Sequence, residues 1–143
     1  MKKYLLPENG NFYKANLHCH SNFSDGRKTP EQIKERYKEL GYSIVAYTDH
    51  EILVPHPELN DERFLALNGF EMSIDEPTVN EKGYRKCCHI CYIALEPDNL
   101  NQPCWHREHY LWGNAVSHKE EVKFDENEPD YVRRFGSEGI SEA

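Results

Sequence analysis

Two histidines and a nearby carboxylate are the first residues whose types and spacing suggest chemistry. His18 and His20 are two residues apart, and Asp25 follows within a Ser/Asp/Gly turn. In a β-strand, residues two apart share a face, so both imidazoles should point the same way while Leu17 and Cys19 pack on the other side. Imidazoles on a stiff element, with an oxygen ligand on a nearby loop, are typical of a metal site. The alternative is a pair of ordinary histidines at a strand end.

Further metal-binding side chains fall where later strands are predicted. His50 follows one apolar run, Glu71 ends the next, and His89 lies within a fourth. The C-terminal ends of parallel strands meet at one edge, where α/β folds place their active sites. Asp49 is expected to accept the second N–H of a histidine and so orient its ring. The sequence therefore predicts that six metal ligands converge: His18, His20, Asp25, His50, Glu71 and His89.

A strand, a helix and a second strand should position the first of these ligands. The first strand is expected over residues 12–18 and the second over residues 42–48. Between them, Thr29 fits a helix N-cap, Pro30 fits the first helical position, and Gln32 completes a capping box. Gly41 is a natural residue to end the helix. Because one helix links the two strands, they should be parallel.

The second half of the chain is predicted to be a hairpin followed by irregular structure. Strands are expected over residues 63–72, with a possible interruption at Gly69, and over residues 84–95, joined by a polar turn at 76–82. Residues 96–130 lack a sustained period, and we interpret 99–130 as a long loop or insertion. Within it, residues 99–124 should form a substrate lid, with Arg107, His106 or Lys119 near the phosphate. The last seven residues resemble the start of another helix.

The cysteines and remaining histidines have simpler interpretations. Cys88 and Cys91 are three apart, so a strand places them on opposite faces and they cannot share a metal. Cys87, His89 and Cys91 do share a face. We predict that the cysteines are small buried hydrophobic residues. His56 and His118 have no partner in the sequence and should lie on the surface.

The composition excludes several classes of protein. A chain of 143 residues forms at most one domain, and its net charge of −8 disfavours nonspecific nucleic-acid binding. No apolar run is long enough to span a membrane, and the apolar residues before Pro7 are too few for a signal peptide. Five cysteines, an odd number, do not suggest a disulfide framework. These observations together predict a cytoplasmic protein.

Four motifs occur along the chain in a specific order. They are His18-x-His20 with Ser24-Asp25-Gly26, Thr48-Asp49-His50, Gly69-Phe70-Glu71, and His89. In this order they resemble the PHP (polymerase and histidinol phosphatase) family, over about residues 12–98. The resemblance implies a distorted barrel of βα units with up to three divalent metal ions and phosphoester hydrolysis. It also implies a first metal at His18, His20 and Glu71, a second at Glu71 and His89, and a third at Asp25 and His50.

The chain also departs from that family. PHP proteins use a histidine from a later strand and a late Asp-x-His pair, whereas this sequence has no histidine after His118. A complete α/β barrel needs at least about 200 residues. We therefore expect an α/β fold that is an incomplete, distorted barrel, with three or four strands and one clear helix. Residues 1–143 would be the N-terminal part of a single PHP-type domain.

These features predict an enzyme that hydrolyses a phosphoester in a small metabolite or nucleotide. Zn²⁺, Mn²⁺ and Fe²⁺ all suit imidazole and carboxylate ligands, and the sequence does not choose among them. The alternative is a non-catalytic, truncated fragment that binds metal or a partner. Apolar strand faces left exposed by a partial barrel would then drive oligomerisation or strand swapping. A nuclease-like role is least favoured, because the chain is acidic and has no basic patch.

Overall fold

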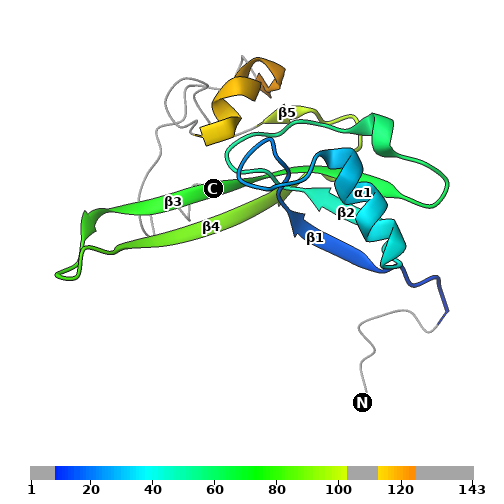
Figure 1. The fold of residues 1–143 in the computed structure, drawn as a ribbon, viewed down its shortest axis with the longest axis horizontal. Helices are drawn as coiled ribbons and strands as arrows, with labels where there is room; N and C mark the ends of the chain where they lie inside the picture. Colours follow the sequence, from blue (N-terminus) through cyan, green and yellow to red (C-terminus); the bar gives the residue numbers. More distant parts are fainter. Residues whose placement is uncertain (1–8, 103–112, 125–143) are drawn as a thin grey trace.

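Four strands form a mixed sheet that curls into a half-barrel in the computed structural model, which describes residues 9–102 and 113–124 (Figure 1). The strands lie in chain order: β1 (Ala15–Cys19), β2 (Ile44–Tyr47), β3 (Leu65–Val79) and β4 (Arg85–Ile93). β1, β2 and β3 run parallel, and β4 pairs antiparallel with β3. The predicted incomplete α/β barrel is therefore confirmed, as are the parallel first strands and the hairpin.

The helix α1 (Pro30–Glu39) begins where the capping box predicts. The Gln32 amide donates to the Thr29 hydroxyl at 3.3 Å, and the Gln32 side chain accepts from the Thr29 amide at 3.1 Å. Gly41 follows the helix with a φ of +76°, which a glycine adopts without strain. The helix packs on the sheet through a buried core of Ile33, Val45, Tyr47, Leu59, Phe64 and Ala66.

A bulge in β1 changes which side chains face the helix. Asn16 pairs with Val45 and Cys19 pairs with Tyr47, so β1 has one residue more than β2 over this interval. Asn16 then donates to the Tyr37 hydroxyl at 2.6 Å, and Cys19 packs against the core. The prediction that Leu17 packs beside Cys19 is wrong, because the extra residue breaks the alternation and leaves Leu17 53% exposed.

The strand β3 is longer than predicted. It passes through Gly69 without interruption and extends to Val79, because β4 pairs with it from Gly69 onward, with a register shift between Asp75 and Val79. Gly69 is required for close approach, since a Cβ there would lie 2.5 Å from the Tyr92 carbonyl oxygen. The hairpin turn is confined to residues 80–83, where the Gly83 amide donates to the Asn80 carbonyl. β3 therefore projects well beyond the end of β2.

Short elements cover the loop after β2. The 3-10 helix η1 (Pro57–Leu59) lies in the predicted loop, and β5 (Asn101–Gln102), η2 (Gly113–Glu121) and β6 (Lys123–Phe124) lie in the run predicted to be irregular. Ala115 and Val122 join Ile52 in a second core, with Phe23 packed against it. The predicted C-terminal helical turn lies outside the described residues.

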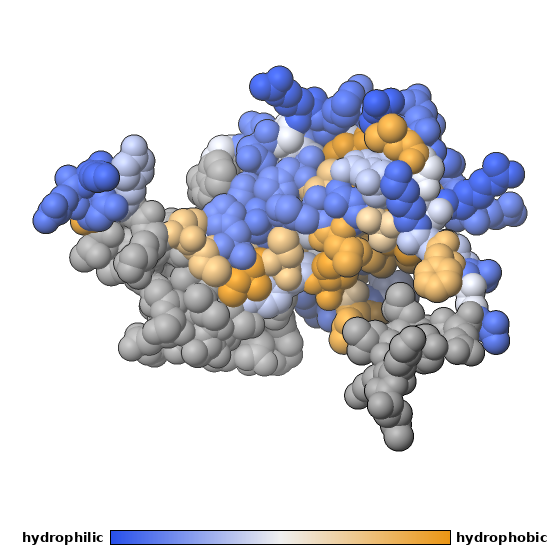
Figure 2. Space-filling model, turned by 90° about the horizontal axis from the view of Figure 1, so that it is seen from below, coloured by the Kyte–Doolittle hydropathy of each residue, from blue (hydrophilic) through white to orange (hydrophobic). Residues whose placement is uncertain are grey.

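The surface of the half-barrel retains apolar side chains. Seen from below, a band of hydrophobic residues crosses the middle of the molecule, with hydrophilic residues above it (Figure 2). Leu65 of β3 is 42% exposed, and Phe12 and Tyr13 before β1 are more exposed still. Within the described ranges, no helix is both long and apolar enough to cross a membrane.

Candidate metal centre

The carboxylate of Glu71 lies at the centre of a cluster of four histidines. Its side chain is 6% exposed. Oε2 lies 3.0 Å from His20 Nε2 and 3.1 Å from His50 Nδ1. Oε1 lies 3.2 Å from His89 Nδ1 and 3.6 Å from His18 Nε2. Each carboxylate oxygen thus faces two imidazoles that come from different strands or from the segments that follow them.

The extension of β3 beyond β2 creates this arrangement. His50 forms an isolated parallel bridge with Glu71, just after β2 ends. The Glu71 amide donates to the Asp49 carbonyl at 3.0 Å, and the Glu51 amide donates to the Glu71 carbonyl at 2.8 Å. Glu51 has a φ of +70°, a sparsely populated conformation for a residue with a side chain. The chain therefore turns sharply next to His50 while its backbone remains bonded to β3.

Asp25 lies on the far side of the buried histidines. Its Oδ1 is 2.7 Å from His20 Nδ1, and its Oδ2 is 3.7 Å from His50 Nε2. Burial alone would raise the pKa of the Asp25 carboxyl, but the hydrogen bond and charge of His20, together with His50, lower it. Burial lowers the pKa of His50, and the neighbouring His20 lowers it further. Anionic Asp25 and neutral His50 are the forms that bind metal ions.

Asp49 holds the loop between the first ligands. Its Oδ1 accepts from the Ser21 amide at 2.8 Å and from the Ser24 hydroxyl at 2.7 Å, and its Oδ2 accepts from the Ser21 hydroxyl at 2.7 Å. We expected Asp49 to orient a histidine ring directly. Instead, both oxygens bond to the loop that joins His20 to Asp25, so Asp49 positions these ligands through the backbone.

A glycine completes this loop. A Cβ on Gly26 would collide with the carbonyl oxygen of His20 and would lie 2.6 Å from that of Ser21. The Gly26 amide also donates to the Ser21 carbonyl at 2.8 Å. The turn is therefore closed on itself, and only a residue without a side chain fits at this position.

Cys91 is a site residue that our sequence interpretation missed. It lies directly opposite Glu71 in the β3–β4 register, and its Sγ is 3.0 Å from His18 Nδ1. The Thr48 hydroxyl lies 2.9 Å from the same ring nitrogen. Burial and the Glu71 charge raise the pKa of the Cys91 thiol, which Thr48 partly offsets. Cys91 is two residues from His89, which indicated that the two side chains share one face of β4. The approach of β4 to His18 depends on the curl of the sheet, which the sequence did not indicate.

The prediction that the cysteines are buried hydrophobic residues is wrong for two of them. Cys87 and Cys91 are exposed, because β4 is an edge strand of the described sheet. Cys19 and Cys88 are half-buried, and Cys19 contributes to packing as expected. Cys104 lies outside the described residues.

Two buried polar atoms of the cluster lack hydrogen-bond partners within the described residues, and a bound metal ion would replace these partners. His20 Nε2 and Glu71 Oε2 are both buried and 3.0 Å apart, yet in the described structure neither has a hydrogen-bond partner. Buried polar atoms without partners are rare, and a metal bound between them would satisfy both. Among the residues that the structure describes, two sets of three ligands lie close enough together to hold an ion: His20, His50 and Glu71, and His18, Glu71 and Cys91.

Comparison with known families agrees with this geometry. The sequence model of the PHP domain matches residues 16–137. The chain belongs to the PHP domain family. The match covers all six predicted ligands, and proteins of this family are generally hydrolase-like and use divalent metals. A comparison with curated proteins found no match.

Of the three predicted substrate-binding residues, the structure of this PHP domain describes only Lys119. Lys119 lies in η2 and is exposed. His106 and Arg107 lie outside the described residues, so their role stays a prediction.

Two other histidines have clear structural settings. His56 is buried, with edge-to-face contacts to the rings of Phe23 and Tyr47, so its predicted surface position is wrong. The residues that bury it come from separate segments, which local sequence patterns do not reveal. His118 is half-buried and stacks on Phe23 at 3.9 Å between ring centroids. The aromatic contacts of Phe23 thus join η2 to the loop that carries Asp25.

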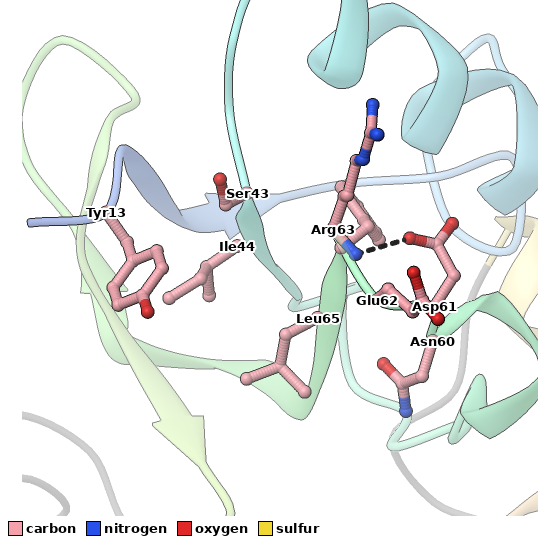
Figure 3. Close-up of a pocket in the computed structure, with 9 residues that line it drawn as sticks. Tyr13, Ser43, Ile44, Asn60, Asp61, Glu62, Arg63 and Leu65 are labelled. Carbon is pink, nitrogen blue, oxygen red and sulfur yellow. Dashed lines mark hydrogen bonds between the residues drawn. The ribbon is translucent and has the colours of Figure 1, made fainter. Parts of the chain in front are cut away.

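A separate cavity of about 540 Å³ lies at the other end of the strands (Figure 3). Near it, the Arg63 amide donates to Asp61 at 2.8 Å. Histidine and cysteine are absent from its lining, and parallel sheets place their active sites at the C-terminal edge. We therefore assign no catalytic role to this cavity in the PHP domain. It is lined by Tyr13, Ser43, Ile44, Asn60, Asp61, Glu62, Arg63, Phe64 and Leu65.

Proposed function

We propose that this PHP domain hydrolyses a phosphoester in a small phosphorylated metabolite or nucleotide, using divalent metal ions held around Glu71. The observation that supports this most is the approach of four imidazoles to one buried carboxylate, with distances of 3.0–3.6 Å. Nitrogen and oxygen ligands of this kind suit Zn²⁺, Mn²⁺ or Fe²⁺. Up to three ions would be held by His18, His20, Asp25, His50, Glu71 and His89.

Burial divides the ligands into two groups. The side chains of His20, His50 and Glu71 are at most 18% exposed, so they would anchor metal with little competition from water. The side chains of His18 and His89 are 51% and 40% exposed, so they leave one side of the centre open to a substrate. Divalent ions bound there would neutralise the phosphate oxygens and activate water for attack on phosphorus.

The charge of the whole chain favours a small substrate. A net charge of −8 repels a nucleic-acid backbone, whereas a single phosphate needs only the local positive charge of a metal centre. Arg107, His106 and Lys119 would add positive charge near that phosphate. As the cysteine usage of the sequence predicts, we place this activity in the cytoplasm.

Turnover by the 143-residue chain tests this function. The metal-free protein would be loaded with Zn²⁺, Mn²⁺ or Fe²⁺, and phosphate release would be measured from a panel of sugar phosphates and nucleotides. Glu71→Gln should abolish release, since it removes the carboxylate shared by all four histidines. Glu120→Gln, at an exposed position, is the matched control and should retain full activity. Absence of turnover with every metal, despite bound metal, would contradict the proposal.

A second candidate is a non-catalytic module that binds metal and assembles through its apolar strands. The exposure of Leu17 and Leu65 favours it, because such side chains are usually covered in a complete barrel. The covering element would be a second copy of the chain, in a homo-oligomer or swapped dimer. Mass measurement in solution, combined with the turnover assay, separates the two candidates. Efficient hydrolysis by a monomer would exclude the second, and a metal-loaded dimer without turnover would exclude the first.

A further inference from the structure

We propose that Cys91 is a thiolate ligand of a divalent metal ion bound with His18 and Glu71. This inference rests on the metal centre proposed above and adds a sulfur ligand to it. The six ligands predicted from the sequence are all imidazoles or carboxylates. A thiolate would change which metal this part of the centre prefers.

The register of the hairpin places the thiol in the centre. Glu71 and Cys91 are directly opposed across β3 and β4, so their side chains leave the same face of the sheet with Cβ atoms roughly 5 Å apart. The ligand atoms of Cys91, His18 and Glu71 all lie within 4.8 Å of one another. Ligand atoms of a tetrahedral zinc ion are roughly 3.5 Å apart, so a small adjustment would bring all three to one ion.

A second observation indicates that this cluster binds something. The Glu71 side chain is more than nine-tenths buried and points among the imidazoles, and its Oε1 lies 3.6 Å from His18 Nε2 and 3.2 Å from His89 Nδ1. A buried carboxylate costs free energy unless its charge is compensated. A bound cation compensates that charge.

The setting of His18 leaves a nitrogen for the same ion. The Thr48 hydroxyl lies 2.9 Å from His18 Nδ1, so it can orient the ring as the outer partner of a ligating histidine does. His18 Nε2 then faces Glu71 Oε1 at 3.6 Å. A simple S–H···N hydrogen bond would account for the 3.0 Å between Cys91 and His18, but it would not compensate the charge of the buried Glu71 carboxylate beside them.

A sulfur ligand has a chemical consequence. Thiolates favour Zn²⁺ and other soft ions over Mn²⁺, which prefers oxygen ligands. Binding releases the thiol proton to solvent as the metal–sulfur bond forms. The set formed by His20, His50 and Glu71 contains only nitrogen and oxygen. The two halves of the centre would therefore differ in metal preference.

Cobalt substitution of the full chain tests the inference by a readout that does not depend on activity. Co²⁺ bound to a thiolate gives a near-ultraviolet sulfur-to-cobalt charge-transfer band, whereas nitrogen and oxygen ligands give only the weaker visible bands. Cys91→Ser should remove the charge-transfer band and keep visible bands. Cys87→Ser is the matched control, because Cys87 is on the same face of β4 but about 13 Å along the strand. Its spectrum should match that of the wild type.

Metal affinity gives a second readout. Cys91→Ser should weaken Cd²⁺ or Zn²⁺ binding at this position by roughly tenfold or more, with a much smaller effect on Mn²⁺. Cys91→His should restore the affinity without the charge-transfer band, provided that circular dichroism shows a folded chain. Visible bands with no charge-transfer band in the wild type would overturn the Cys91 inference and leave the proposed metal centre intact. Failure of the wild type to bind Co²⁺ at all would overturn both.

Discussion

The carboxylate of Asp49 accepts hydrogen bonds from both the amide and the hydroxyl of Ser21, at 2.8 and 2.7 Å. Both residues are buried, Ser21 completely. This contact fastens the loop after β1 to the end of β2, immediately beside His50. The positions of His20 and Asp25 relative to His50 therefore depend on a residue that binds no metal itself.

Replacing Asp49 by alanine should loosen this loop. The change removes three buried hydrogen bonds to a carboxylate and leaves the Ser21 amide without its acceptor, so we expect a loss of about 2–4 kcal/mol in the free energy of unfolding. Metal affinity should fall roughly 10- to 100-fold, as when other supporting groups around metals are removed. Urea denaturation and calorimetric titration with Zn²⁺ measure the two effects.

Asp98→Ala provides the control for that experiment. Asp98 is exposed, so its removal should change stability by less than about 0.5 kcal/mol and leave metal affinity unchanged. If Asp49→Ala bound metal as tightly as Asp98→Ala, the loop would not depend on this contact.

Replacing Gly26 by alanine tests the geometry of the loop. The new methyl group would collide with the carbonyl oxygens of His20 and Ser21, and these are backbone atoms that cannot rotate away. We expect a loss of about 1–3 kcal/mol in stability and weaker metal binding, since the displaced loop carries Asp25.

Gly83→Ala is a control that separates the effect on stability from the effect on metal binding. Gly83 lies in the hairpin turn at a φ of +80°, with open space around its Cβ position. Alanine there should cost about 1–2 kcal/mol through backbone strain and leave metal binding unchanged. Equal metal affinity in the two variants would show that Gly26 serves stability alone.

His56 should make stability depend on pH. Burial lowers the pKa of its imidazole, although Glu58 partly offsets this effect. The unfolded chain therefore binds the proton more tightly than the folded chain. The stability contributed by neutral His56 is fully present above about pH 6.5, the ordinary histidine pKa, and is lost as the pH falls through the folded-state pKa.

Urea denaturation of metal-free protein between about pH 8 and pH 5 measures this dependence. His56→Gln should reduce the loss of stability at acidic pH relative to the wild type. Glu58→Gln should steepen it, because removing that charge lowers the folded-state pKa of His56 further. If the free energy of unfolding of His56→Gln fell with decreasing pH as steeply as that of the wild type, other groups would be responsible for the acid sensitivity.

Much of the architecture could be predicted because its signals are local. Thr29, Pro30 and Gln32 are close in sequence and fix the start of α1. Apolar runs before His50 and Glu71 predicted that these residues lie close together, as the structure finds, although Glu71 lies within β3 and not at its end.

The features that escaped prediction depend on contacts between distant segments. The bulge that exposes Leu17 arises from pairing with β2, and the aromatic residues that bury His56 come from separate parts of the chain. Cys91 could be placed on the face of His89, but its approach to His18 requires the curl of the sheet across β1, β2, β3 and β4. Strand periodicity carries no information about that curl.

Locating bound metal in a crystal tests the proposed centre at Glu71 most directly. Crystals of the 143-residue chain grown with Zn²⁺ or Mn²⁺ would be measured on both sides of the absorption edge of the metal, so that anomalous differences identify the ion. We expect a peak about 2.0–2.3 Å from a Glu71 carboxylate oxygen and close to at least two histidine nitrogens. At saturating metal, a map with no peak at Glu71, or with peaks only elsewhere on the protein, would contradict the account.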